Sequence, residues 1–88
     1  MLSEPERALK ERLDAYYDWP CAFLFKFIVP QERGSELLAL FGAEAQVRTR
    51  ESSGGRYLAV TAEVGMTGSD AVLAVYRQAG EIEGVVAL

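Results

Sequence analysis

Two segments of the chain alternate apolar and polar residues, which is the pattern of half-buried β-strands. They are "AQVRTRES" at 45–52 and "RYLAVTAEV" at 56–64, and the Ser-Ser-Gly-Gly sequence between them predicts a turn. Strand, turn and strand together predict a β-hairpin. A third segment, 21–29, is rich in Phe, Ile and Val and carries Lys26 as its one charged residue, and 84–88 is a short apolar stretch. Both are expected to form strands as well.

Apolar residues at helical spacing predict a first helix over about 5–16. Ser3 and Glu6 have the spacing of a capping box, in which each residue satisfies a backbone N–H of the first turn. Lys10 is expected to form i,i+4 ion pairs with Glu6 and with Asp14 on the exposed side of this helix.

Two further helices follow from the same spacing. The segment 35–42 predicts a short helix with Ser35 as its N-cap. A longer amphipathic helix is expected to begin near residue 70, with Ser69 or Thr67 as its cap, and to end at Gly80.

The order of elements is therefore one helix followed by β-α-β-β-α-β. Right-handed crossovers close this order most simply as a ferredoxin-like split βαβ fold, an α+β architecture with a four-stranded antiparallel sheet. At 88 residues the chain is expected to form one domain, 1–88. Residues 1–19 would be an N-terminal helical extension and 20–88 the βαββαβ core.

The first strand has two different faces, since successive side chains point to opposite sides of a sheet. Phe23, Phe25 and Phe27 share one face and are expected to pack under the helices, so Lys26 points to the other, open face. The same reasoning places further candidate binding residues beside it: Arg48, Arg50, Tyr57 and Thr61. Two interpretations are consistent with this pattern. The face is either solvated, with its arginines protecting an edge strand from aggregation, or it binds a ligand or partner.

Composition excludes several kinds of chemistry. The chain has no His, which excludes Ser-His-Asp and Cys-His catalysis and histidine metal sites. One Cys cannot form an intrachain disulfide or a CxxC pair, and neither common phosphate-binding glycine motif is present. We therefore expect no enzyme activity, no cofactor and no metal site. The sequence also predicts no signal peptide and no membrane span, and so a cytoplasmic protein.

Three segments give the chain a family resemblance: "YYDWPCAFLFKFIV", "SSGGRYLAVTAEV" and "VLAVYRQAG…GVVAL". Over about residues 16–88 the sequence resembles the YbeD-like family of small uncharacterised bacterial proteins. The resemblance implies a ferredoxin-like fold and similarity to ACT-type regulatory domains, and it brings no established activity or ligand.

Two functions are consistent with these observations. The first is a non-catalytic regulatory or adaptor domain that binds a ligand, a protein partner or a second copy of itself through the open sheet face or a sheet edge. The alternative is RNA binding, because the RRM domain shares the order of elements and binds RNA on the same face. The net charge of −4 disfavours nucleic acid, and only Tyr57 supplies an aromatic ring to that face.

Overall fold

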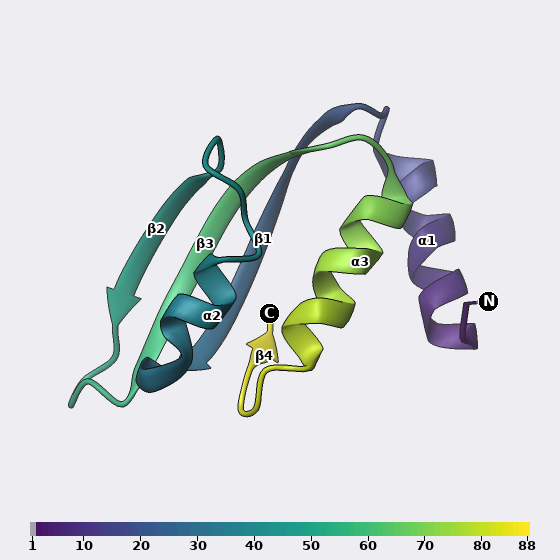
Figure 1. Cartoon of the computed structure of the whole chain (residues 1–88). Helices are drawn as coiled ribbons and strands as arrows, with labels where there is room; N and C mark the ends of the chain where they lie inside the picture. Colours follow the sequence, from purple (N-terminus) through teal and green to yellow (C-terminus); the bar gives the residue numbers. More distant parts are fainter. Residues whose placement is uncertain (1) are drawn as a thin grey trace.

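The computed structural model describes residues 2–88 as a four-stranded antiparallel sheet with three α-helices (Figure 1). The strand order is β2-β3-β1-β4, so the first and third strands lie at the centre. This confirms the α+β, ferredoxin-like arrangement with an additional N-terminal helix. The elements are α1 Glu4–Tyr16, β1 Cys21–Pro30, a 3-10 turn Gln31–Arg33, α2 Gly34–Leu38, β2 Gln46–Glu51, β3 Tyr57–Met66, α3 Ser69–Gly80 and β4 Val86–Ala87.

The core lies between the sheet and the helices. Phe25 and Phe27 of β1 are almost completely buried and contact the rings of Phe41 and Tyr76, with ring centroids 5.5–6.1 Å apart. The predicted orientation of β1 is therefore confirmed: its phenylalanines face the helices. On the opposite face Leu24 and Lys26 are exposed, and none of the helices in residues 2–88 covers them.

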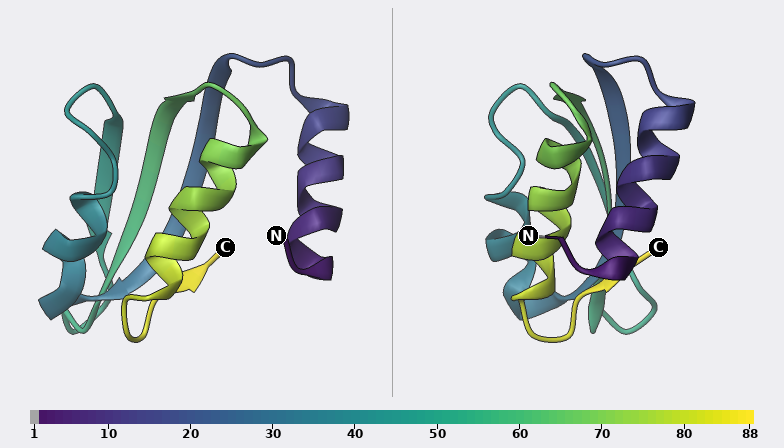
Figure 2. Two further views of the ribbon diagram at one scale, coloured as in Figure 1. Left: turned by 45° about the vertical axis from the view of Figure 1, so that its right-hand side comes forward. Right: turned by 90° about the vertical axis from the view of Figure 1, so that its right-hand side faces the viewer.

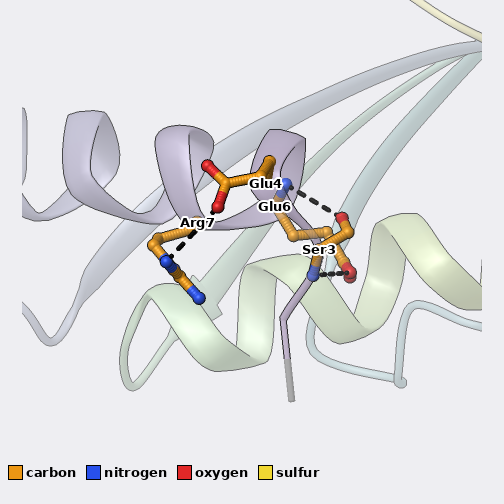
Figure 3. Close-up of polar contacts among 4 residues, drawn as sticks. All are labelled: Ser3, Glu4, Glu6 and Arg7. Atoms are coloured by element: carbon orange, nitrogen blue, oxygen red, sulfur yellow. Dashed lines mark hydrogen bonds and ion pairs between the residues drawn. The ribbon is translucent and has the colours of Figure 1, made fainter.

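Helix α1 lies beside α3 (Figures 1 and 2) and buries Leu13 in the core. Its start is the predicted capping box: Ser3 N–H donates to Glu6 Oε1, and Glu6 N–H donates to Ser3 Oγ (Figure 3). The predicted pair of Lys10 with Asp14 is present at 3.3 Å. The predicted Glu6–Lys10 pair is not, because the Glu6 carboxylate instead accepts a hydrogen bond from Arg77 of α3.

The second helix is shorter than predicted. A 3-10 turn follows β1 directly, and α2 then spans Gly34–Leu38 without a side-chain cap, so Ser35 is not its N-cap. Beyond Leu38 the chain continues with 3-10 geometry, because the N–H groups of Leu40 and Phe41 donate hydrogen bonds to the carbonyl oxygens three residues earlier. The 3-10 geometry still directs Phe41 into the core.

Helix α3 begins where predicted but without the predicted side-chain cap. Gly68 is its N-cap residue and has no capping side chain. Ser69 is buried, and its hydroxyl accepts a hydrogen bond from Lys10 Nζ at 2.8 Å. The contact with α1 therefore uses the group that was expected to cap the helix.

Strand β2 is not half-buried as predicted, because all six of its residues are exposed. It lies at the end of the sheet, where only β3 pairs with it (Figure 1). The five-residue α2 packs against β1 and leaves the helix side of β2 open, so Val47 remains 38% exposed.

None of the helices described for residues 2–88 combines the length and the apolar composition that crossing a membrane requires.

Candidate functional site

Lys26, Thr61 and Arg48 form one row across three strands on the helix-free side of the sheet. Lys26 of β1 lies opposite Thr61 of β3, and Thr61 lies opposite Arg48 of β2. Paired residues of antiparallel strands point to the same side, so three of the predicted site residues lie side by side. We call this side the open face; its residues are Leu24, Lys26, Ile28, Gln46, Arg48, Arg50, Tyr57, Ala59, Thr61, Glu63 and Val86.

Apolar residues lie on both sides of this row. On one side Leu24 is paired with Glu63, and on the other Ile28 is paired with Ala59, which in turn is paired with Arg50. Strand β4 adds Val86 next to Ile28. Leu24 is 49% exposed, Tyr57 47% and Val86 53%. The open face thus presents exposed apolar surface together with three cations, a combination typical of interaction surfaces.

The cations of the open face differ from most of those on the helices, of which Arg12 alone forms no ion pair within residues 2–88. Arg7, Lys10, Arg33 and Arg77 each form an ion pair with a carboxylate. Lys26, Arg48 and Arg50 form none with any residue in 2–88. Their charge is therefore available to an anionic group from outside the chain.

Two hollows cover much of the open face. The first, of about 340 Å³, is lined by Leu24, Lys26, Gln46, Arg48, Thr61 and Glu63. The second, of about 400 Å³, is lined by Ile28, Arg50, Glu51, Ser52, Ser53, Tyr57 and Ala59. Both reach residues of β2, so one ligand or segment lying along β2 would contact both hollows.

Tyr57 is placed as predicted on the open face, at the first position of β3. Its backbone N–H donates to Ser52 Oγ, which fixes the start of the strand next to the turn. In the part of the chain that the structure describes, no second aromatic residue occupies β1 or β3 on this face, because the β1 phenylalanines are buried. A pair of stacking rings for RNA bases is therefore missing from the two central strands.

The sequence did not reveal the contribution of the C-terminal residues. Val86 reaches the open face through its pairing with Ile28, and Leu88 N–H donates to the carbonyl oxygen of Lys26. Leu88 is 69% exposed. No signal in the sequence gives the register of so short a strand. Ala59, in contrast, could have been placed from its alternation with Tyr57 and Thr61.

Groups outside the open face offer little chemistry. Tyr76 packs against Phe25 and Phe27, and burial, with a smaller effect of nearby Tyr17, raises the pKa of its hydroxyl. Cys21 is half-buried at the start of β1. Within residues 2–88, three or more His, Cys, Asp or Glu side chains nowhere gather in a way that could hold a metal ion.

Comparison with known families gives a match over residues 14–88 to a family described as "Protein of unknown function (DUF493)". The match begins in the last turn of α1 and includes every strand. Comparisons with curated proteins and with solved structures gave no match.

Proposed function

Because the chain belongs to the DUF493 family of proteins of unknown function, we propose a role on the basis of its surface: a non-catalytic regulatory or adaptor domain. It would act by binding an anionic ligand or protein partner through the open face and its β2 edge. The similarity to ACT-type regulatory domains that the sequence resemblance implies favours the same class of function.

The observation that carries this proposal is the unpaired charge of Lys26, Arg48 and Arg50 beside exposed apolar side chains. Exposed Lys and Arg attract anionic groups over roughly 10 Å at moderate ionic strength. Burial of Leu24 and Val86 under a partner would remove apolar surface from water and so add to the binding free energy that the charges supply. The chain is acidic overall, with a net charge of −4, so this cationic face also orients an approaching anion.

The absence of histidine from the sequence supports a non-catalytic role, since His is the most common acid–base group near neutral pH. RNA binding is less well supported than protein or ligand binding. Tyr57 is the single aromatic residue that β1 and β3 place on the open face, whereas RRM-type recognition stacks bases on two or three rings.

A matched pair of variants tests the proposal. The open-face variant carries Lys26→Gln, Arg48→Gln and Arg50→Gln. The control carries Arg7→Gln, Arg12→Gln and Arg56→Gln, which removes the same charge from exposed positions elsewhere. Urea melts first establish that both variants remain folded.

The measurement is capture from lysate of the source organism, with proteins and small molecules both identified by mass spectrometry. We expect one partner to be retained by the wild type and the control and lost by the open-face variant. Retention by all three proteins, or by none of them, would contradict the proposed role of this face.

A further inference from the structure

Strand β2 forms an edge of the sheet with free backbone hydrogen-bonding groups. It is six residues long, contains neither Pro nor Gly, and pairs on one side only. The opposite edge is formed by β4, which is two residues long and therefore a poor template for another strand. Among the strands longer than two residues, β2 is the one that is free along the whole length of one side, so it offers the longest template for an added strand.

The register identifies the backbone groups that β2 presents to its free side. Ser52 N–H donates to the carbonyl oxygen of Tyr57, so this pair is a hydrogen-bonded one. Hydrogen-bonded and non-hydrogen-bonded pairs alternate along an antiparallel ladder. Arg48 and Arg50 are then hydrogen-bonded to β3, and Val47, Thr49 and Glu51 direct their N–H and C=O groups outward.

The side chains of β2 define what kind of strand fits there. Arg48 and Arg50 point to the open face two residues apart, while Val47 and Thr49 point to the helix side. A strand paired with β2 would place its alternate side chains beside these two sets. Acidic residues at every second position would meet the arginines, and apolar or β-branched residues between them would meet Val47 and Thr49.

We infer that β2 binds an extended acidic segment of a partner protein as a fifth strand, with acidic and apolar residues in alternation. This inference rests on the proposed function and specifies its partner. Backbone hydrogen bonds would supply affinity, and the charge pattern would supply specificity, as in other cases of strand addition.

A second copy of the chain fits this edge poorly. If the β2 strands of two copies paired antiparallel about a two-fold axis at residue 48, 49 or 50, an arginine of one copy would lie opposite an arginine of the other. Like charges directly opposite each other destabilise strand pairs. The arginines therefore act against self-pairing and favour an acidic partner.

The test uses two labelled peptides of identical composition. In one, glutamate and valine alternate; in the other, the glutamates are grouped at one end. Fluorescence anisotropy at low salt should show tighter binding of the alternating peptide. Replacement of Arg48 and Arg50 by Gln should weaken that binding by about fivefold, the effect of two exposed ion pairs.

Thr49→Pro tests the backbone contact directly. Proline removes the outward N–H of Thr49 without removing a hydrogen bond to β3, and proline is tolerated on edge strands at such positions. We expect Thr49→Pro to abolish binding of the alternating peptide and Thr49→Ala to retain it. If circular dichroism shows that Thr49→Pro is unfolded, N-methylated versions of the alternating peptide replace this variant. Methylation of the backbone amides at one set of alternate positions should abolish binding. Methylation at the other set should not.

Several results would overturn the inference. Equal binding of both peptides would show that charge alone is recognised. The same conclusion would follow if neither Thr49→Pro nor methylation of the peptide amides weakened binding of the alternating peptide. Light scattering that shows a dimer sensitive to Thr49→Pro would assign the edge to a second copy. Displacement of the peptide by single-stranded RNA at lower concentration would assign it to nucleic acid. If the wild type binds neither peptide while the open-face variant still loses its captured partner, strand addition fails and the proposed function stands.

Discussion

Arg77 of α3 donates a hydrogen bond from Nε to the Glu6 carboxylate of α1, and thereby joins two helices that are 71 residues apart in sequence at this point. The other oxygen of the same carboxylate accepts the N–H of Ser3 and completes the helix cap. One side chain therefore both begins α1 and fixes it to α3. Alteration of Glu6 should affect the attachment of α1 without disturbing the sheet.

Acid should loosen this attachment. The hydrogen bond from Arg77, with smaller contributions from Ser3, lowers the pKa of Glu6 from 4.5 to about 2. A carboxylate with a lowered pKa in the folded state stabilises that state fully above its unfolded pKa, and the contribution is lost as pH falls from 4.5 towards 2. The urea midpoint of Glu6→Gln should therefore fall less than that of the wild type between about pH 6 and about pH 3.

Glu6→Gln should remove only part of the protein's sensitivity to acid, because the pKa of Asp14 is also lowered. Its pKa is lowered by the Ser69 hydroxyl first and by the Trp19 indole N–H next. Amide hydrogen exchange in α1 provides an independent readout, since local detachment exposes these amides before the sheet unfolds. Identical pH profiles for the wild type and Glu6→Gln would show that Arg77 does not fix α1.

Lys26→Met tests whether Lys26 lies on the open face, and the measured quantity is the free energy of unfolding. Lys26 is exposed and forms no ion pair within residues 2–88, so its replacement should change the free energy of unfolding by no more than about 0.5 kcal/mol. Phe25→Ala, at the neighbouring position on the buried face, should cost roughly 3–5 kcal/mol. Urea denaturation of both variants gives the comparison. A large loss for Lys26→Met would mean that this side chain has a buried partner.

Gly84 is needed for the turn that returns the chain to the sheet. Its φ is +83°, and a Cβ atom there would lie 2.6 Å from Pro30 Cγ. Gly84→Ala should therefore destabilise the protein by about 1–2 kcal/mol from the backbone conformation alone, with an additional cost from the contact. Gly42→Ala is the control, because a Cβ atom at that position meets nothing within 4 Å. Thermal unfolding should separate the two variants, and equal stability would show that the turn can be rebuilt without glycine.

Tyr76 should act through packing and not through its hydroxyl. Its ring contacts Phe25 and Phe27 edge-on. Tyr76→Phe keeps the ring and should change the free energy of unfolding by less than about 1.5 kcal/mol, the usual limit for swaps of similar volume. Tyr76→Ala removes the ring and should cost about 3–5 kcal/mol, as for other aromatic truncations. Equal losses in urea melts of the two variants would assign the stabilisation to the hydroxyl group.

Prediction from sequence succeeded where a regular pattern has one physical meaning. Period-two alternation placed Lys26 and Phe25 on opposite faces of β1, and helical spacing with a capping box placed the start of α1 correctly. It failed where neighbours decide the outcome. Ser69 has the chemistry of a helix cap, but Lys10 from another helix occupies its hydroxyl. Strand β2 has the alternation of a half-buried strand, but no helix covers it.

The sequence by itself determined the strands, two of the three helices and the side of β1 that faces the core, because these follow from local periodicity and from the burial of phenylalanine. The tertiary structure alone decided which of the predicted open-face residues lie opposite one another and that Val86 joins them. The register of β1 with β3 and of β3 with β2 places Lys26 and Arg48 on either side of Thr61, and the pairing of β4 adds Val86. The lengths of α2 and β4 leave β2 as the accessible edge. The pairing of β1 with β3 and with β4 joins segments that are distant in sequence, and no local pattern encodes that pairing.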